Sequence, residues 1–185
     1  MNKIYQLYLL ISICFVTIQV SASTSERDTY TLYNVSKFER QWVKKLLPQM
    51  IDWVVTQEKK SSLVGRTLTD EEKILAEKLG IQNIALVRIV VDENLPMPTI
   101  QPLRDGFEHF GFNTKEFIGL TLGHVIYIKP NVKDVKNLLS HELVHVTQYE
   151  QMGIEKFLER YFIEIMKFGY HAAPLELEAS RFSKV

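Results

Sequence analysis

Apolar residues recur every three or four positions through the last third of the chain, and this spacing is typical of amphipathic helices. The pattern predicts helices over Val135–Met152 and Ile154–Phe168, which end at Gly153 and Gly169, and a short helix that begins at Pro174. Within the first of these helices the apolar side chains collect on one face. That face is expected to pack against the core.

Helical spacing also dominates the N-terminal half. Apolar positions recur at this spacing between residues 35 and 55, but Pro48 interrupts them and is expected to open a second helical segment. Residues 57–66 are mostly polar and predict a linker. Thr69 and Glu72 then have the spacing of a capping box, so another helix is expected to start there.

Two short runs rich in β-branched residues predict strands, over residues 84–91 and over Val125–Ile128. The proline-rich stretch 93–102 excludes a central strand or helix, and Asp105–Gly106 indicates a turn. Strands that are this few, set among several helices, favour an α+β fold with a small sheet.

Length and composition limit the organisation and the partners of the protein. A chain of 185 residues, 46% apolar and 24% charged, is suited to one globular domain rather than two. We expect a single domain over 23–185, with a helical N-terminal part (23–80) and a core that carries the chemistry (84–185). Lys plus Arg and Asp plus Glu are equal at 22 each, so no basic surplus favours nucleic acid as a partner.

The first 22 residues have the organisation of a secretory signal peptide. A short charged start precedes a mostly apolar run, and Val20-Ser21-Ala22 ends it with the small residues of a signal-peptidase site. Cleavage after Ala22 would give a secreted or periplasmic protein without stable membrane insertion. The alternative is an uncleaved membrane anchor, which the polar interruptions in the run make less favourable. The only cysteine, Cys14, would leave with this segment, so any metal must be held by His, Asp or Glu.

The sequence HELVH, residues 141–145, is the strongest chemical feature. On a helix, His141 and His145 are about 40° apart and project to one side, next to the predicted core face. Glu142 lies beside them, close enough to act on a metal-bound water. Two imidazoles one turn apart with a neighbouring carboxylate are the arrangement that a zinc-dependent hydrolase needs.

A catalytic zinc ion takes a third protein ligand, and the sequence offers several. The extended pattern HExxHxxGxxH is absent, because Gln148 and Gln151 stand at its last two positions. Glu164 alternates with apolar residues and is expected on a solvated helix face. Glu176 and Glu178 follow a complete intervening helix, which lets the chain return to the histidines. Helix geometry leaves both of these glutamates open.

The combination of HELVH with the later segment PLELEA resembles the gluzincin metallopeptidases, and the stretch 86–182 is similar to small bacterial zincin-like proteins. The resemblance implies a zincin-like fold, one Zn²⁺ ion, Glu176 as the third ligand and Glu142 as the general base. It departs at Ser180, where the family usually has an aspartate that orients a histidine.

The resemblance also implies a peptide or protein substrate, which would lie along an open strand edge. We expect that edge on the strand that ends at Ile128. The oxyanion donor would be a tyrosine or a histidine, with Tyr170, His171 and Tyr149 as candidates. A rival interpretation, prompted by Ser180, is a zincin-like domain that binds zinc as a scaffold without turnover.

Overall fold

The computed structural model describes residues 29–109 and 117–183, and the expected signal peptide at 1–22 lies outside them. The elements in chain order are α1 (Thr29–Leu32), α2 (Lys37–Ser61), α3 (Asp70–Lys78), a 3₁₀ turn η1 (Ile84–Leu86), β1 (Arg88–Val91), α4 (Gln101–His109), β2 (Gly119–Leu122), β3 (Val125–Ile128), α5 (Val135–Met152), α6 (Ile154–Phe168), a 3₁₀ turn η2 (Tyr170–Ala172) and α7 (Pro174–Phe182). The fold is α+β with a small sheet, as expected. No helix in the described ranges is long and apolar enough to cross a membrane.

The sheet has three strands in the order β1-β3-β2. β1 runs parallel to β3, and β2 runs antiparallel to it. The prediction of an open edge at Ile128 is therefore wrong, because β3 is the central strand and is covered on both sides. The outer strand on the side of HELVH is β2. Two residues, Gly123 and His124, connect it to β3, and Gly123 takes the positive φ of 63° that so tight a connection favours.

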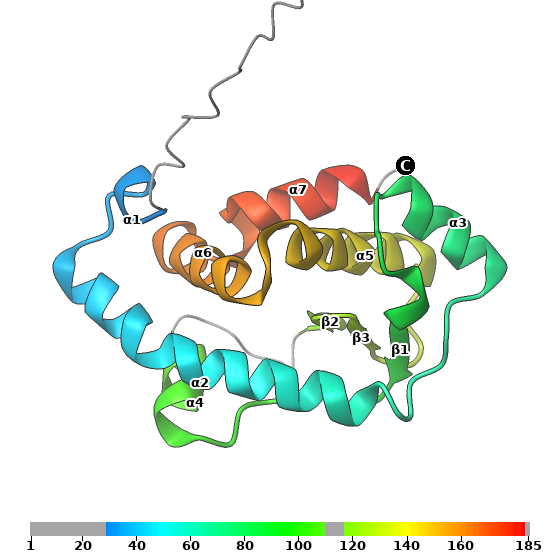
Figure 1. Cartoon of the computed structure of the whole chain (residues 1–185), viewed down its shortest axis with the longest axis horizontal. Helices are drawn as coiled ribbons and strands as arrows, with labels where there is room; N and C mark the ends of the chain where they lie inside the picture. Colours follow the sequence, from blue (N-terminus) through cyan, green and yellow to red (C-terminus); the bar gives the residue numbers. More distant parts are fainter. Residues whose placement is uncertain (1–28, 110–116, 184–185) are drawn as a thin grey trace, which may run out of the picture.

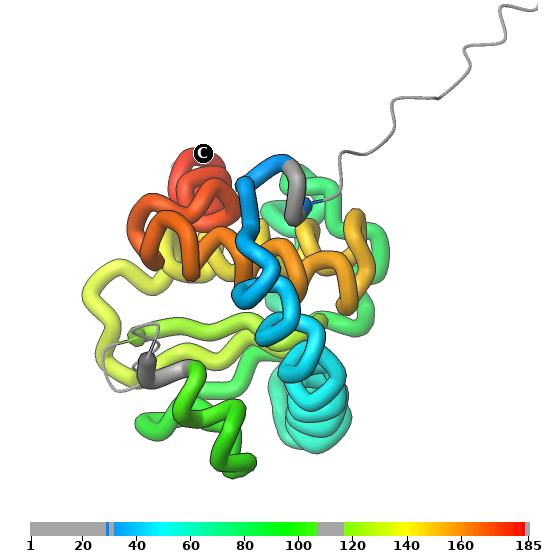
Figure 2. The backbone as a smooth tube through the Cα atoms, turned by 90° about the vertical axis from the view of Figure 1, so that its left-hand side faces the viewer, coloured from blue at the N-terminus to red at the C-terminus, as the bar shows by residue number. Residues whose placement is uncertain are grey.

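Helices cover both faces of this sheet (Figure 1). Ile126 and Ile128 of β3 pack with Leu143 of α5, whereas Val125 and Tyr127 belong to the cluster that contains α2. The alternation explains why all four residues of β3 are apolar and buried. Seen from the side, the strands lie between a layer of α5, α6 and α7 and a layer of α2 and α4 (Figure 2).

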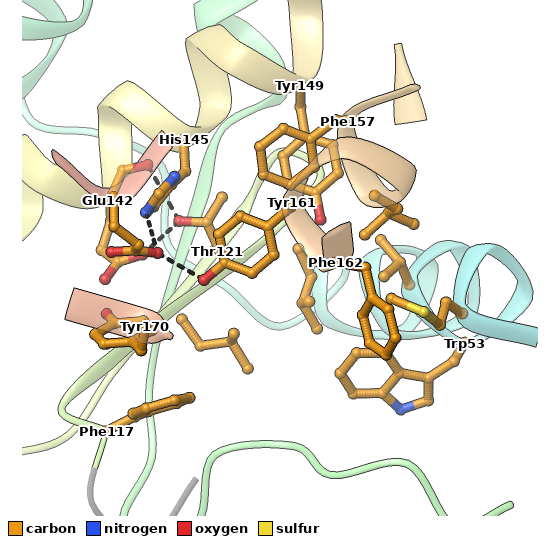
Figure 3. A pocket seen from close by; sticks show the side chains of 17 residues that line it. Trp53, Phe117, Thr121, Glu142, His145, Tyr149, Phe157, Tyr161, Phe162 and Tyr170 are labelled. Atoms are coloured by element: carbon orange, nitrogen blue, oxygen red, sulfur yellow. Dashed lines mark hydrogen bonds and ion pairs between the residues drawn. The ribbon is translucent and has the colours of Figure 1, made fainter. Parts of the chain in front are cut away.

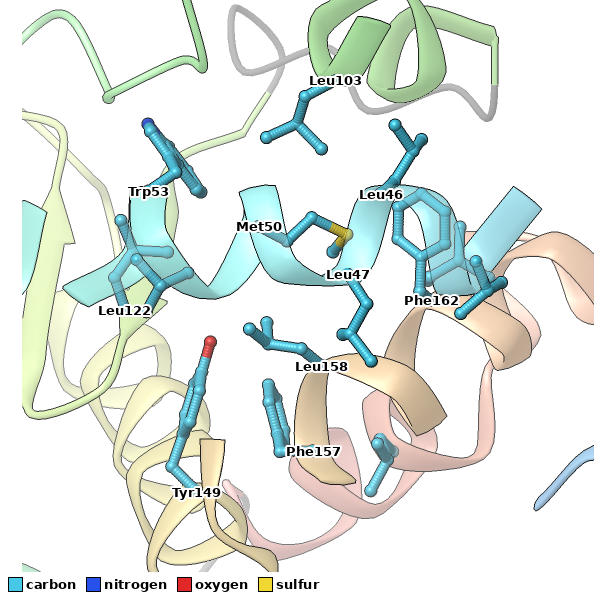
Figure 4. Close-up of a cluster of buried hydrophobic side chains, with 14 of the residues drawn as sticks. Leu46, Leu47, Met50, Trp53, Leu103, Leu122, Tyr149, Phe157, Leu158 and Phe162 are labelled. Carbon is cyan, nitrogen blue, oxygen red and sulfur yellow. The ribbon is translucent and has the colours of Figure 1, made fainter. Parts of the chain in front are cut away.

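α2 is one continuous helix, so the prediction of two segments separated by Pro48 is wrong. Proline removes one backbone donor, but Pro48 is exposed and solvent can satisfy the freed carbonyl. The helix also extends through Ser61 and takes up half of the expected linker. Its buried side, with Leu47 and Met50, packs on α6 through Phe162 (Figure 4). The N-terminal helical part thus shares its core with the rest of the fold.

α4 corrects the expected turn at Asp105–Gly106, because the helix runs through both residues. A Cβ at Gly106 would come within 2.8 Å of the Trp42 ring. The glycine therefore serves the close approach of α4 to α2 rather than a change of chain direction. Leu103, which is fully buried, anchors α4 in the same cluster.

The expected strand at 84–91 is also shorter than predicted, since its first residues form η1 and only Arg88–Val91 is a strand. The carboxylate of Glu150 on α5 accepts hydrogen bonds from the backbone N–H groups of Gln82 and Asn83, at 2.6 and 2.9 Å. These bonds hold the chain in a turn just before η1. Helices α3, α5, α6 and α7 agree with prediction: α5 and α6 have the expected bounds, α7 begins at Pro174, and the Thr69–Glu72 capping box is formed.

A half-buried polar cluster joins the β2–β3 turn to two helices. The His124 ring contacts Glu58 of α2 through Nδ1 at 2.9 Å and Glu150 of α5 through Nε2 at 3.2 Å. The hydrogen bond to Glu58 is the main cause that raises the pKa of His124, and the same bond lowers the pKa of Glu58. The cluster is strongest when the imidazole is protonated and the carboxylates are ionised.

This cluster predicts a pH-dependent contribution to stability. A raised folded pKa means that the contribution of His124 is complete below its unfolded pKa of about 6.5 and is lost as the pH rises through the folded pKa. We expect His124→Gln to lower the free energy of unfolding by about 1 kcal/mol at pH 5.5 and by clearly less at pH 9. Urea denaturation of both proteins at the two pH values, with a chelator present, measures this. An equal loss at both values would assign the effect to packing instead of charge.

Candidate metal centre

α5 places His141 and His145 one helical turn apart with both Nε2 atoms facing the same point. The two Nε2 atoms are 3.2 Å apart, and the rings meet nearly edge to face at 81°. Leu139, Leu143 and Val146 of the same helix lie in the core, as the sequence predicts. Core packing of this face therefore sets the rotation of α5, and the rotation aims both imidazoles at one position.

Glu176 of α7 completes the group. Its Oε2 lies 3.1 Å from Nε2 of His141, and its Oε1 lies 3.3 Å from Nε2 of His145. Glu178 is exposed and instead accepts a hydrogen bond from Gln148 at 2.9 Å. Of the two glutamates that the sequence leaves open, Glu176 is thus the one that meets the histidines.

These three residues could hold a metal ion. Each offers one ligand atom, and these atoms all lie within 4.8 Å of one another. Tetrahedral coordination with bonds near 2.1 Å would separate its ligand atoms by about 3.4 Å. The separations of 3.1 to 3.3 Å between the imidazole nitrogens and the carboxylate oxygens are close to that value. Two imidazoles and one carboxylate also match the ligand set of a metal site that keeps an open position.

The charges of the group favour a cation. Burial alone would lower the pKa of His145, but the adjacent Glu176 carboxylate outweighs it and raises this pKa to about 9. Burial would likewise raise the pKa of Glu176, yet His145 and His141 hold it far below its usual range. Without a metal, a proton on His145 therefore compensates the buried carboxylate. A bound ion would take over that role and release the proton.

Glu142 lies beside His141, His145 and Glu176, and a residue of the sheet holds its side chain in place. It is only 4% exposed, and its Oε2 accepts a hydrogen bond of 2.7 Å from the Thr121 hydroxyl on β2. A Cβ at Gly119 would lie 2.5 Å from the other carboxylate oxygen, so only glycine lets β2 pass this close. Burial raises the pKa of Glu142, whereas the charges of His145 and His141 lower it to a smaller extent. A carboxylate with a raised pKa is a better proton acceptor near neutral pH.

Gln148 fixes the orientation of His145. Only its place one turn further along the same helix face could have indicated this role in the sequence. Its Nε2 donates to the backbone oxygen of Leu175 at 3.1 Å and to Glu178, both of which only accept. Its Oε1 must then face Nδ1 of His145, at 2.8 Å, and accept a hydrogen bond from the Nδ1–H group. In the neutral imidazole this leaves the Nε2 lone pair free to bind a metal.

Glu164 corrects the expectation of a solvated residue on α6, because it is completely buried. One of its oxygens accepts hydrogen bonds from the Tyr33 hydroxyl at 2.6 Å and from Arg160 at 2.7 Å. The other accepts from the backbone N–H of Leu175 at 2.8 Å, at the start of α7. α7 has no N-terminal cap of its own, so Glu164 supplies the negative charge there. This contact fixes α7 at Leu175, one residue after its start at Pro174 and directly before Glu176.

The aromatic side chains around the group divide into those that contact it and one that does not. Tyr161 donates a hydrogen bond of 2.6 Å to Oε1 of Glu176, although the sequence indicated only a core position on α6. Tyr170 stacks on Phe117, and its pKa is raised by burial and then by the nearby Glu176 and Glu142 carboxylates. His171 is exposed and lines an outer cleft.

Tyr149, the third candidate for an oxyanion donor, points elsewhere. Its ring lies on Phe157, with centroids 3.8 Å apart, and its hydroxyl group accepts a hydrogen bond from the backbone of Gly123. Figure 4 shows this hydroxyl on the side of Leu122 and Trp53. Tyr170 and His171 therefore stay candidates by position, and Tyr149 does not.

Two spaces meet at the group. One is an apolar cavity bounded by α2, β2, α5 and α6, with Glu142, His145 and Glu176 at one end (Figure 3). The other is an open cleft lined by His141, Glu142, Tyr170 and His171. A molecule in the cleft would therefore reach the group from solvent and have the cavity directly beyond it.

The hydrogen bonds of Gln148 predict a loss of metal affinity on truncation. Gln148→Ala removes the acceptor for Nδ1 of His145 and the link to α7, so we expect zinc affinity to fall about 10- to 100-fold. Gln151→Ala, at an exposed position of the same helix, is the matched control and should leave the affinity unchanged. Competition titration with a chromophoric chelator measures both. Equal affinity of the two variants would mean that packing alone orients His145.

The buried position of Glu164 predicts a loss of both stability and metal affinity. In Glu164→Gln the amide nitrogen must face at least one of the three donors. We therefore expect the free energy of unfolding to fall by about 3 kcal/mol. Glu155→Gln, at an exposed site of α6, should change stability by no more than about 0.5 kcal/mol. Urea denaturation and zinc titration check the pair. A loss of stability without any loss of zinc affinity would separate Glu164 from the placement of Glu176.

Comparison with known proteins yields no match for this chain: no protein-family model, no curated protein and no solved structure is similar to it. The function must therefore be inferred from the residues that the fold brings together. These are His141, His145 and Glu176 as a possible metal-binding group, with Glu142 held beside them by the outer strand of the sheet.

Proposed function

We propose that the protein is a zinc metallopeptidase with a zincin-like fold. The observation that carries the proposal is the meeting of four side chains from two helices: His141, His145 and Glu176 as ligands and Glu142 as a buried base next to them. Two imidazoles and one carboxylate suit zinc. The place of Glu142 in the sequence, between His141 and His145, is the one that the general base of a zinc hydrolase takes. The resemblance of HELVH and PLELEA to gluzincins agrees with this assignment.

β2 offers a place for the substrate backbone. The N–H of Lys129 donates to the oxygen of Ile118 at 2.9 Å, so these two residues form a hydrogen-bonded pair. Along an antiparallel ladder, hydrogen-bonded pairs alternate with pairs that are not hydrogen-bonded to each other. By this alternation the backbone groups of Gly119 and Thr121 point away from β3. An extended peptide could pair with them as an added strand and would then pass in front of Glu142.

The chemistry follows from the residues around that path. A bound zinc ion would polarise the substrate carbonyl and lower the pKa of a coordinated water. Glu142, oriented by Thr121, accepts the proton of the attacking water and passes it to the leaving amine. Tyr161 is occupied by its hydrogen bond to Glu176. Tyr170, which borders both the cleft and the cavity, is the better placed donor to the developing oxyanion.

The proposal predicts that Glu142 is needed for turnover but not for metal binding. We expect Glu142→Gln to retain one zinc ion and to cleave a mixed peptide library at least about 100-fold more slowly than the wild type. Glu178→Gln should retain both zinc and cleavage, whereas Glu176→Gln should lose zinc. Metal analysis by mass spectrometry and identification of the cleavage products by peptide sequencing measure the two properties.

The same experiment separates the rival function. Zinc in the wild type and in Glu142→Gln, with no cleavage by either, would support a zinc-binding scaffold instead of an enzyme. Absence of zinc from the wild type after incubation with the metal would contradict both the peptidase and the scaffold. A secreted or periplasmic location stays part of the proposal, and fractionation of cells that express the complete chain tests it.

A further inference from the structure

The cavity beyond the candidate metal centre is apolar along most of its length. Its ionisable side chains Glu142, His145 and Glu176 gather at one end, together with the Thr121 hydroxyl. The opposite end is closed by Met50, Trp53 and Val54 of α2, as Figure 3 shows for Trp53. An apolar space with its polar groups at one end favours a ligand with the same division.

Aromatic rings form one wall of the cavity and begin at a metal-binding residue. The ring of Tyr161 lies 6.1 Å from that of His145, and Phe157 follows at 5.5 Å from Tyr161, stacked at 19°. Leu120 and Leu122 of β2 line the facing side. Because β2 also carries the outward backbone groups of Gly119 and Thr121, a chain paired with β2 would place a side chain at the mouth of this cavity.

The size of the cavity limits what it can accept. Its volume is about 60 Å³ measured for the centre of a water-sized sphere. Since one water needs at least about 10–15 Å³ on this measure, the space holds about four to six such spheres. A leucine or methionine side chain has four heavy atoms and a phenylalanine side chain has seven. The cavity therefore fits the first two well and the third closely, and a tryptophan side chain exceeds it.

We infer that this cavity is the specificity pocket of the protein and binds an apolar side chain of leucine to phenylalanine size. The side chain belongs to the substrate residue next to the scissile bond, because the reacting group and the cavity share Glu142, His145 and Glu176. This inference rests on the proposed peptidase function, because only a peptidase would have a substrate with a scissile bond here. The N-terminal helix α2 thereby sets the depth of the pocket, although it contributes no metal ligand.

The test uses hydroxamates, which bind zinc directly and carry one side chain beside the metal-binding group. Two series of compounds are tested on the zinc-loaded protein, one with the side chain on each side of the metal-binding group. In each series the side chain is that of glycine, leucine, phenylalanine, tryptophan or aspartate. We expect the leucine and phenylalanine compounds of one series to bind about 10- to 100-fold more tightly than the glycine compound. The tryptophan and aspartate compounds should gain nothing. Isothermal titration calorimetry measures the affinities.

Two substitutions in α2 provide a matched pair. Val54 and Val43 are both 1% exposed and lie on the same face of the helix, but only Val54 lines the cavity. Val54→Phe should reduce the leucine compound to the affinity of the glycine compound and leave the glycine compound unchanged. Val43→Phe carries a similar overpacking strain and should keep the preference for leucine. Val54→Ala, which enlarges the space, should move the preference from leucine towards phenylalanine and tryptophan.

The outcomes separate the pocket from the peptidase. Hydroxamates that bind equally whatever their side chain would overturn the pocket, as would an unchanged preference in both Val54→Phe and Val54→Ala. Peptide cleavage without any preference beside the cleaved bond would overturn the pocket and support the peptidase. Side-chain-dependent binding without peptide cleavage would support the pocket and count against the peptidase.

Discussion

The buried carboxylate of Glu176 is the constraint on which the site depends. An ionised carboxylate removed from water costs several kcal/mol unless opposite charge or hydrogen bonds compensate it. Here two imidazoles and the Tyr161 hydroxyl surround it. With a proton on His145 the charges of the group balance, and a divalent ion in place of that proton would leave one positive charge beside the Glu142 carboxylate. The same arrangement that makes the buried charge tolerable therefore favours a cation over an apolar filling.

The carboxylate is useful only if α7 holds it within bonding distance, and two polar residues from other helices perform this task. Glu164 of α6 accepts a hydrogen bond from the backbone N–H of Leu175 in α7, while Gln148 of α5 donates to the backbone oxygen of the same residue. One residue of α7 is thus held at both of its backbone groups. Gln148 also binds His145, so the position of α7 and the orientation of a ligand are coupled through a single side chain.

The sequence predicted the parts of the molecule that local pattern determines. The bounds of α5 and α6, the start of α7 and the convergence of His141 with His145 follow from helical periodicity and from Gly and Pro at the ends. Residues whose role depends on distant partners were not predictable in this way. Glu164 has the spacing of an exposed residue, and only Tyr33, more than a hundred positions earlier, together with Arg160 and Leu175, makes its burial favourable.

The errors in the remaining elements have the same origin. Gly106 is typical of a turn, but it lies in a helix because the ring of Trp42 occupies the space that a side chain would need. Pro48 is typical of a helix start, but core contacts of α2 on both sides of it hold the helix together. In each case tertiary packing outweighed a local preference of about 1 to 3 kcal/mol.

α2 contributes no residue to the possible metal-binding group, yet it borders the candidate site. It lies across the sheet from α5, and its apolar face is shared between the main core and the far end of the cavity. A shift of this helix would change the depth of the cavity and would also disturb Glu58, which holds the β2–β3 turn through His124. Because Thr121 of β2 donates a hydrogen bond to Glu142, α2 is linked to Glu142 both by its contacts with β2 and by the Glu58–His124 contact. Substitutions in the N-terminal helical part are therefore expected to shift Glu142 through β2, even where they leave His141, His145 and Glu176 untouched.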